Sequence, residues 1–359
     1  MRSRDRELRD RLLSWFAEQK RQLPWRGSKD PYAIWVSEVM LQQTTVGAVR
    51  GRYEAFLARF PDVASLAAAP RESVLAEWSG LGYYGRARNL HAAAEIVARD
   101  HGGQLPSEPS VLRELPGFGE YMAAAVPSIA YGVRAPAADA NVDRVVSRLF
   151  AIEGVAGSRA HRNLVLEATE RLLPDQRPGD LIAAFMDLGQ IICTPRRPAC
   201  GSCPLLSECA AAAEGDPVRY PRKRARAPMA RVSYAAADAR RAGRILMVRR
   251  RAGWLGGMWE LPSAEGATPA AARRALAGRV RELGLRLDLA APRHFASHTI
   301  MRRRLDIEIV DAVPFASGRW DAPRALGAKW FLPRELAAAA IPTLTRKIAR
   351  AGGFLPAEV

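Results

Sequence analysis

Residues 115–119 read Leu-Pro-Gly-Phe-Gly and separate two stretches whose apolar residues repeat with the period of a helix. Two glycines, Gly117 and Gly119, allow a tight hairpin here, because glycine adopts left-handed backbone angles without steric cost. They also let the backbone approach a ligand, and the N–H groups that open the next helix can bind a phosphate. An ordinary turn between helices explains these five residues equally well, so the flanking sequence has to decide.

A strongly apolar helix is predicted upstream, over residues 32–45. One face carries apolar residues at helical spacing, namely Tyr32, Trp35, Val36, Val39 and Met40. The opposite face carries the acid Glu38 among apolar residues such as Ile34 and Leu41. A helix that is apolar on both faces is buried or lines a cleft, so we expect Glu38 to be shielded from bulk water.

A second acid precedes a helix that is predicted downstream, where residues 139–144 read Asp-Ala-Asn-Val-Asp-Arg. The apolar face of this helix consists of Val142, Val145, Val146 and Leu149, which puts its start near residue 140. Asp139 therefore lies at the helix N-terminus, where the macrodipole stabilises a carboxylate. A helix cap with no further role is the alternative.

The four cysteines all lie within residues 193–209 and are spaced Cys193-x6-Cys200-x2-Cys203-x5-Cys209. Such clustering in a large chain indicates a metal site rather than a disulfide framework. Zinc sites with four cysteines usually contain two CxxC pairs, whereas this sequence contains a single pair. The spacing therefore favours a [4Fe–4S] cluster, with structural zinc as the alternative.

Length and charge restrict the class of protein. A chain of 359 residues is long enough for two or three domains. Lys and Arg outnumber Asp and Glu by 54 to 37, and the net charge of +17 favours a polyanionic partner, although a genome rich in Arg and Ala is an alternative cause. The N-terminus lacks an apolar signal segment and no stretch approaches the ~20 apolar residues of a membrane span, so we expect a cytoplasmic protein without membrane contact.

Composition divides the chain into three parts. Residues 1–213 follow helical patterns, residues 214–230 form a basic, proline-containing stretch typical of a linker, and residues 231–359 predict an α+β domain. The elements expected in the last part are two strands at 244–251 and 304–310 and a helix at 269–283.

Several motifs occur together in one order along nearly the whole chain. They are Leu23-Pro24-Trp25-Arg26, the helical stretch from Trp35 to Thr44, Gly80-Leu81-Gly82-Tyr83-Tyr84, the hairpin at 115–119, Asp139-Ala140-Asn141 and the four cysteines. In this combination the chain closely resembles the MutY-type adenine DNA glycosylases of the helix–hairpin–helix superfamily. The resemblance implies an all-α glycosylase domain with a [4Fe–4S] cluster, followed by a Nudix-like α+β domain. It also implies a monomeric, nucleoid-associated base excision repair enzyme that removes adenine mispaired with 8-oxoguanine or guanine in double-stranded DNA.

The resemblance assigns chemistry to the two acids. Glu38 matches the acid that protonates N7 of a flipped adenine, and its apolar neighbours are expected to raise its pKa towards neutrality. Asp139 matches the carboxylate that stabilises the oxocarbenium-like sugar, and the helix terminus is expected to keep it ionised. Tyr121 and Asn141 match residues that hold this second carboxylate. Tyr121 also replaces the Schiff-base lysine of endonuclease III-type enzymes, which implies a monofunctional enzyme.

Contacts to DNA or the substrate follow from the same resemblance. The residues assigned to them are Trp25, Arg26, Leu41, Gln42, Gln43, Tyr83, Gly117, Gly119, Ser297 and His298. Trp25 and Arg26 match the lining of the adenine pocket, and Gln43 and Tyr83 match side chains that wedge into the base stack. Ile182-Ala183 departs from the family, which usually has a polar pair there, so an adenine contact is expected to be missing or supplied elsewhere.

The last part of the chain resembles the Nudix-like domain of the family through Leu255–Pro262. Its helix at 269–283 carries Glu282 as its clear acid, too few to bind Mg²⁺, so pyrophosphate hydrolysis is not expected. His294–His298 matches the loop that recognises 8-oxoguanine. Because Ala296 stands where the family commonly has an aromatic residue, Ser297 and His298 are the expected contacts.

Two other functions stay open at this point. A bifunctional glycosylase with lyase activity is opposed by Tyr121. A module that binds damaged DNA without catalysis is opposed by the presence of both Glu38 and Asp139.

Overall fold

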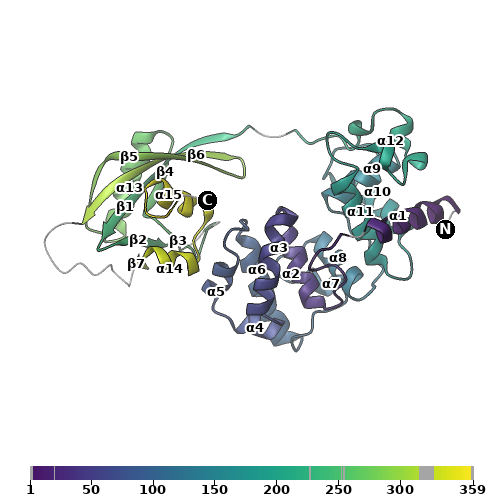
Figure 1. Cartoon of the computed structure of the whole chain (residues 1–359), viewed down its shortest axis with the longest axis horizontal. Coiled ribbons are helices and arrows are strands. Elements are labelled where there is room, and N and C mark those ends of the chain that lie inside the picture. The colour runs from purple at the N-terminus through teal and green to yellow at the C-terminus, as the bar shows by residue number, and fades with distance from the viewer. Residues whose placement is uncertain are drawn as a thin grey trace. The chain divides into compact units, whose positions relative to one another are not determined.

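The computed structural model describes residues 3–19, 21–225, 228–251, 253, 255–314 and 327–356. They form two compact units, whose elements are labelled in Figure 1. The first unit comprises Met1–Ala68 and Ala92–Arg226, and the second comprises Ala69–His91 and Ala227–Val359. Among the described residues, no helix combines the length and the apolar character needed to cross a membrane.

The first unit is built from helices. They are α1 (Ser3–Gln19), α2 (Pro31–Leu41), α3 (Val46–Arg59), α4 (Val63–Ala68), α7 (Pro109–Leu112), α8 (Glu120–Ala130), α9 (Ala140–Leu149), α10 (Arg159–Leu172), α11 (Pro178–Ile191) and α12 (Ala210–Ala213). Short 3₁₀ turns lie at Cys200–Ser202, Leu206–Glu208 and Pro217–Arg219. Helix α6 (Gly85–Asp100) contains residues of both units.

One core cluster of the first unit lies between α1, α9, α10 and α11, which are bundled together in Figure 1. Helix α1 contributes Leu8, Leu12 and Phe16, which share one face and are almost fully buried. Phe185 of α11 packs into the same cluster and is 1% exposed. This packing fixes the position of α9, whose first turn follows Asp139.

The predicted hairpin joins α7 to α8. The N–H of Phe118 donates to the carbonyl of Leu115 at 3.1 Å, and Gly117 adopts φ +85°, which favours glycine. Gly119 is the N-cap of α8, and no heavy atom lies within 4 Å of the place where its Cβ would be. The exposed hairpin therefore leaves its backbone open to a close-lying ligand.

Residues 214–222 differ from the predicted linker because they pack on the first unit. Tyr220 is 4% exposed, and its carbonyl accepts a hydrogen bond from Nε of Arg148 at 3.1 Å. Arg222 forms a parallel β-bridge with Val155. Residues 214–222 are therefore packed and not an extended linker, since the tyrosine ring and the backbone groups around it have partners, and the linker stays a prediction for the residues that follow.

The second unit contains a sheet with helices on both sides. Its helices are α5 (Arg71–Glu77), α13 (Pro269–Glu282), α14 (Pro333–Ala338) and α15 (Thr343–Ala351). Its strands are β1 (Ala230–Arg241), β2 (Arg244–Arg249), β3 (Trp259–Glu260), β4 (Ser263–Gly266), β5 (Leu287–Ile300), β6 (Arg303–Pro314) and β7 (Ala328–Phe331). The described strands are ordered β3-β2-β1-β6-β5, with β4 beside β1 and β7 beside β2; β1 and β6 are parallel and the other pairs antiparallel.

Strand alternation divides the core of the second unit between the two faces of the sheet. Tyr234 and Ala236 of β1 pack with apolar residues of α14 and α15, whereas Ala235 and Ala237 pack against α13. The predicted strands at 244–251 and 304–310 and the helix at 269–283 correspond to β2, β6 and α13. The α+β prediction for this part of the chain is confirmed.

The segment 69–91 belongs to the second unit, although the predicted boundary places it in the first domain. Directed hydrogen bonds explain this difference. Nε1 of Trp259 donates to Oε1 of Glu72 at 2.7 Å, and the hydroxyl of Ser79 donates to the carbonyl of Ile341 at 3.1 Å. No local pattern in the sequence reveals contacts between residues so far apart along the chain.

Candidate active site

Helix α2 places the first candidate acid in the interior of the first unit. It begins at Pro31, after Asp30 accepts a hydrogen bond from the N–H of Tyr32 at 3.0 Å. All residues from Tyr32 to Met40 are buried. Glu38 is 7% exposed, so the prediction that it is shielded from bulk water is confirmed.

The carboxylate of Glu38 accepts a hydrogen bond at Oε2 from the phenol of Tyr121 on α8, at 2.8 Å. Burial raises the pKa of Glu38 to about 7. The bond from Tyr121 and the charge of Arg26 act in the opposite direction, whereas the charge of Asp139 adds to the increase. A carboxyl group with this pKa carries a proton in a large fraction of molecules at neutral pH, as a general acid must.

Asp139 is both the N-cap of α9 and a carboxylate with several donors. Its Oδ1 accepts from the backbone N–H groups of Asn141 and Val142, both at 2.8 Å, and its Oδ2 accepts from the Asn141 amide at 2.8 Å. Burial raises the pKa of Asp139 above its usual range, although these bonds and the charge of Arg144 lower it. The sequence prediction considered only the helix terminus, which favours the anion, and omitted the opposing effect of burial.

The two supporting side chains are arranged differently from the prediction, which gave both to the second carboxylate. Asn141 does bind Asp139, but the phenol of Tyr121 is bonded to Glu38 instead. The reason is geometric, because α2 and α8 pack directly against each other and bring the phenol to the acid. Each acid therefore has its own neutral hydrogen-bond donor.

Arg26 and Asp187 form an ion pair that the sequence analysis missed. Nη2 of Arg26 lies 2.9 Å from both carboxylate oxygens of Asp187, which is 3% exposed on α11. Nε of Arg26 is buried and has no hydrogen-bond partner within the described ranges. Trp25 is 8% exposed and packs edge-on against Tyr53, with ring centroids 5.6 Å apart. The signal for Asp187 was available: it is an acid in a strongly apolar helix, like Glu38 in α2.

Arg144 extends the hydrogen bonds around Asp139 towards the cysteine-containing loop. Its Nη2 donates to the Asn141 side chain at 3.0 Å and to the carbonyl of Gly189 at 2.7 Å. Its Nε donates to the carbonyl of Cys193 at 2.8 Å. Arg144 therefore orients the amide that binds Asp139 and, at the same time, the first residue of the loop.

The four cysteines line one cavity beside α9. All four are free thiols, and the rest of the lining is largely apolar. Arg148, which is 2% exposed, lies with Nη1 3.3 Å from Sγ of Cys193 and donates to the carbonyl of Thr194 at 2.8 Å. Among the described residues no group of three or more ligands is close enough for a single metal ion. Four thiols around a cavity with a buried guanidinium beside them fit a larger, negatively charged cluster.

Comparison with known sequences places this geometry in a family. Residues 36–171 match the HhH-GPD superfamily of base excision DNA repair proteins, and residues 235–351 match the NUDIX domain. Human adenine DNA glycosylase is 32% identical over 401 aligned positions, which cover 95% of this chain and 73% of the human protein. This chain belongs to the adenine DNA glycosylase family.

Other relatives and solved structures agree with this membership of a base excision DNA glycosylase family. The adenine DNA glycosylase of Mycolicibacterium smegmatis is 38% identical over 240 positions, covering 67% of this chain and 79% of that protein. A thermostable thymine-DNA glycosylase superposes with a TM-score of 0.53 at 30% identity, over 59% of this chain and 98% of its own. Endonuclease III trapped on DNA shares the fold, with a TM-score of 0.50 at 24% identity, over 58% of this chain and 96% of its own.

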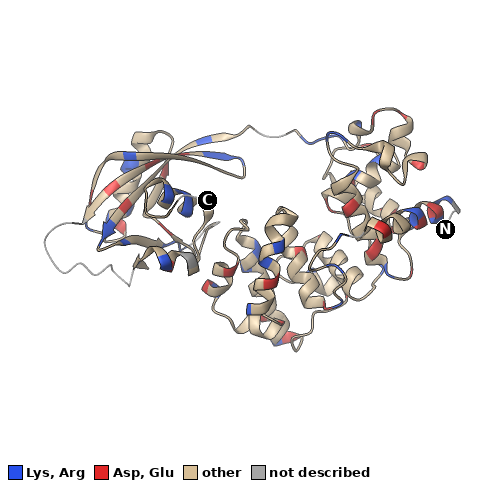
Figure 2. Cartoon of the chain, in the orientation of Figure 1, with Lys and Arg blue, Asp and Glu red and all other residues tan. Residues whose placement is uncertain are grey.

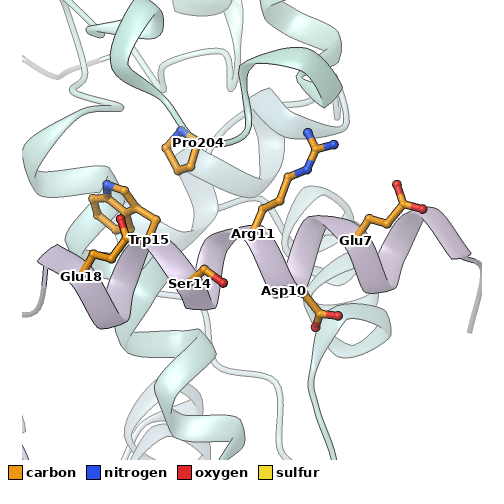
Figure 3. Close-up of a pocket in the computed structure, with 7 residues that line it drawn as sticks. All are labelled: Glu7, Asp10, Arg11, Ser14, Trp15, Glu18 and Pro204. Atoms are coloured by element: carbon orange, nitrogen blue, oxygen red, sulfur yellow. The ribbon is translucent and has the colours of Figure 1, made fainter.

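Helix α1 of the glycosylase supports the cysteine loop from outside. A shallow depression along this helix is lined by Glu7, Asp10, Arg11, Ser14, Trp15, Glu18 and Pro204, as Figure 3 shows. Pro204 belongs to the loop, and Nη1 of Arg11 donates to the hydroxyl of Ser207 in the same loop at 2.7 Å. The lining is mostly charged and contains none of the predicted site residues, so the depression marks a structural contact.

Gln43 lies at an exposed turn directly after α2. Its φ is +54°, in the left-handed region that residues with a side chain rarely adopt. Leu41 ends the helix and Gln42 is its C-cap, and both are half-buried. The turn places Gln43 five residues after Glu38 and directs the chain from α2 into α3.

Tyr83 lies in the second unit and also has a positive φ, +46°. Tyr83 is 44% exposed, and several other large apolar residues are also exposed at the surface of the chain. The turn that carries it contains Gly80 at φ +99° and Gly82 at φ +69°. A side chain that inserts into a base stack has to be exposed, and Tyr83 meets this requirement. The insertion itself stays a prediction.

Ser297 and His298 lie in strand β5, so the prediction that residues 294–298 form a loop is wrong, while their contact with 8-oxoguanine stays a prediction. Both pair with β6, Ser297 opposite Asp306 and His298 opposite Leu305. Because side chains alternate along a strand, Ser297 is exposed beside Phe295, whereas His298 is half-buried on the other face. The turn of this hairpin lies instead at Met301, which is 73% exposed.

Proposed function

We propose that this glycosylase hydrolyses the N-glycosidic bond of adenine mispaired with 8-oxoguanine or guanine in duplex DNA and leaves the strand intact. The observation that carries the proposal is the combination of two acids, in which burial raises the pKa of Glu38 to about 7 and the half-buried Asp139 accepts three hydrogen bonds. The adenine DNA glycosylases at 32% and 38% identity support the choice of base.

Glu38 acts as the general acid. Adenine leaves poorly as an anion, and a proton delivered to N7 allows it to leave as a neutral base when the bond from C1′ to N9 breaks. Burial keeps Glu38 protonated near neutral pH, and the phenol of Tyr121 holds the carboxyl group in one orientation. Such proton transfer is typically worth about 10²–10⁴-fold in rate.

Asp139 stabilises the positive charge that develops on the sugar. Its two oxygens are held by Asn141 and the first turn of α9, so the carboxylate does not have to reorganise when the charge appears. The helix N-terminus favours its ionised form. Water then adds to the sugar, and the products are free adenine and an abasic site.

The enzyme is monofunctional in this proposal because the position after the hairpin holds a phenol. Strand cleavage of the lyase type needs an amine that forms an imine with the sugar. Tyr121 has no amine, and its oxygen is engaged with Glu38. Arg26 follows Trp25 in the chain and is paired with Asp187, and these two charged side chains supply the polar side of the adenine pocket in this proposal, in place of the usual pair at Ile182-Ala183.

A [4Fe–4S] cluster is held by Cys193, Cys200, Cys203 and Cys209 in this proposal. Its support is the cavity that all four thiols line, with the buried guanidinium of Arg148 beside Cys193. The cluster supplies no chemistry to the glycosidic bond; it holds the loop from which Arg196 and Arg197 are exposed to a phosphate backbone. Lys and Arg occur on both units, as Figure 2 shows, so each unit offers cationic side chains to a polyanion.

The second unit reads the base opposite adenine. Adenine is a normal base, so specificity has to come from its partner strand. Ser297 on the exposed face of β5 offers a donor and an acceptor, which can distinguish the C8 oxygen and N7 hydrogen of 8-oxoguanine. His298 faces the other side of the sheet, so it contributes to the position of the strand.

A single-turnover assay tests this function. Excess enzyme is mixed with duplexes containing A opposite 8-oxoguanine, guanine or thymine, and each sample is split for treatment with and without hot alkali. We expect strand breaks only after alkali, fastest for A opposite 8-oxoguanine and absent for A opposite thymine. Glu38→Gln should bind but not cleave, whereas the exposed control Glu54→Gln should match the parent. Breaks without alkali would show a lyase, and binding without cleavage by the parent would show a non-catalytic module.

A further inference from the structure

The turn that carries Tyr83 is stiffened from within. The guanidinium of Arg86 lies between two aromatic rings, 5.3 Å from the centroid of Trp78 and 5.7 Å from that of Tyr83. Its Nη2 donates to the carbonyls of Leu81 and Gly82 at 3.1 and 3.2 Å. These contacts fix the two peptides that precede Tyr83 and hold its ring against a planar cation.

The same turn is tied to the C-terminal part of the chain through Ser79. This residue is 3% exposed, and its hydroxyl donates to the carbonyl of Ile341 at 3.1 Å. The hydroxyl in turn accepts a hydrogen bond from Nη2 of Arg346 on α15 at 3.0 Å. A buried hydroxyl with a donor and an acceptor at fixed positions cannot rotate freely, so Ser79 is held from both sides.

A second attachment lies at the start of the segment. Glu72 on α5 accepts from Nε1 of Trp259 at 2.7 Å and forms an ion pair with Arg249 at 3.4 Å. Arg249 also lies over the Trp259 ring, 5.9 Å from its centroid. Helix α5 is therefore anchored at its first turn by Glu72 and just beyond its last turn by Ser79.

We propose that Arg346, acting through Ser79, is a positioning residue that sets the place of Tyr83 at the DNA. The inference rests on the proposed function in one respect, namely that Tyr83 enters the base stack. Tyr83 follows Ser79 by four residues, and Arg86 holds the turn between them in one conformation, so the place of the Tyr83 ring depends on where Ser79 is held. The C-terminal residues thus act on DNA twice, directly through the exposed face of β5 and indirectly through a side chain of segment 69–91.

Hydrogen exchange in the absence of DNA tests the attachment by itself. Ser79→Ala removes the hydroxyl, and Arg346→Ala removes the guanidinium. We expect each variant to speed amide exchange in residues 79–86 at least roughly tenfold, while helices α9 and α11 keep their protection. Arg346→Lys keeps a donor and a charge and should restore part of the protection. Arg334→Ala, which removes an exposed arginine from α14, is the matched control and should leave exchange in this segment unchanged. Unchanged exchange in both test variants would overturn the proposal.

A double-mutant cycle tests whether the attachment acts through Tyr83. Tyr83→Ala should weaken binding to a duplex with A opposite 8-oxoguanine by roughly 5- to 100-fold, the usual effect of losing one stacking contact. Arg346→Ala should weaken binding by roughly 3- to 10-fold in the parent but by less than about 2-fold when Tyr83 is already alanine. Equal losses in both backgrounds would show that Arg346 acts independently of Tyr83 and would contradict the proposal. If Tyr83→Ala itself has no effect, the assignment of Tyr83 to DNA fails, while the exchange result still decides the attachment.

Discussion

Tyr121 donates a hydrogen bond from its phenol to Oε2 of Glu38 at 2.8 Å. The bond favours the charged carboxylate, so it opposes burial, which raises the pKa of Glu38 to about 7. The two largest influences on this pKa are therefore desolvation, which raises it, and the bond from Tyr121, which lowers it, with further effects from the charges of Asp139 and Arg26.

The first prediction concerns pH. A general acid works in its protonated form, so the single-turnover rate should fall as pH rises through about 7, the pKa of Glu38. Tyr121→Phe removes the bond that lowers this pKa, so the alkaline decline should move to higher pH. Rates measured from pH 5.5 to 9 with saturating enzyme check this. A decline at the same pH in both proteins would contradict the assigned role of Tyr121.

The second prediction concerns stability. Between its unfolded pKa near 4.5 and its folded pKa of about 7, Glu38 releases its proton more readily when the chain is unfolded, so stability decreases as pH rises through this window. Glu38→Gln removes the effect, which amounts to at most about 3 kcal/mol. The variant should therefore gain in Tm relative to the parent from pH 5 to pH 7.5. A Tm difference that does not change with pH would show that Glu38 is not desolvated.

The third prediction separates the two roles of Asp139. Asparagine is also a good N-cap, so Asp139→Asn should keep a Tm close to that of the parent but lose adenine release, because it carries no negative charge. Asp139→Ala should lose activity and also about 1 kcal/mol of stability through the missing cap. Single-turnover rates and thermal unfolding of both variants check this. Near-parental activity in Asp139→Asn would leave Asp139 as a cap only.

The fourth prediction concerns the cysteine loop. Protein isolated without oxygen should contain about four iron atoms per chain and show broad visible absorption, as expected for a [4Fe–4S] cluster. Cys203→Ala should lose iron, and Arg148→Ala should retain less iron than Arg144→Ala, because Arg148 lies beside Cys193 Sγ. Metal analysis gives the iron content of each variant, and DNA binding is measured as a function of salt concentration. Stoichiometric zinc in place of iron would overturn the cluster assignment.

The fifth prediction follows from strand alternation in β5. Ser297→Ala should reduce the preference for A opposite 8-oxoguanine over A opposite guanine by roughly 1–3 kcal/mol, the usual value of a good base contact. His298→Ala should change the preference less and the Tm more, since His298 is half-buried on the other face of the sheet. Single-turnover rates on both duplexes give the ratio. Equal losses of preference in the two variants would mean that β5 separates from β6 before Ser297 contacts the base.

Patterns confined to one element were predictable from the sequence. The start of α9 was placed at residue 140 from four apolar residues, and the burial of Glu38 followed from an α2 that is apolar on both faces. The strand β6 followed from the alternation of Leu305, Ile307 and Ile309, and α13 followed from a run rich in Ala and Arg. In each case the residues that form the sequence pattern lie within the helix or strand that the pattern predicts.

Relationships between elements were not predictable in this way. The partner of the Tyr121 phenol depends on how α2 packs against α8, and Asp187 becomes a partner of Arg26 only through the fold. Ser297 and His298 were expected in a loop because they match a family motif. Such a motif defines which residues are present, but it does not show whether their backbone groups pair with a neighbouring strand. Ser297 pairs with Asp306 in β6, and only that pairing shows which face it occupies.

The bond between Ser79 and Arg346 joins residues 267 positions apart, which has a consequence during synthesis on the ribosome. Both acids and all four cysteines have been translated by residue 209, and the first unit ends at Arg226, so this unit can assemble while the rest of the chain is still being made. Arg346 is translated near the end, and until then the segment around Tyr83 lacks this contact. A nascent chain would thus acquire the two acids of the proposed mechanism before it acquires the contact proposed to position Tyr83, and a ribosome that stops short of α15 would release that immature form.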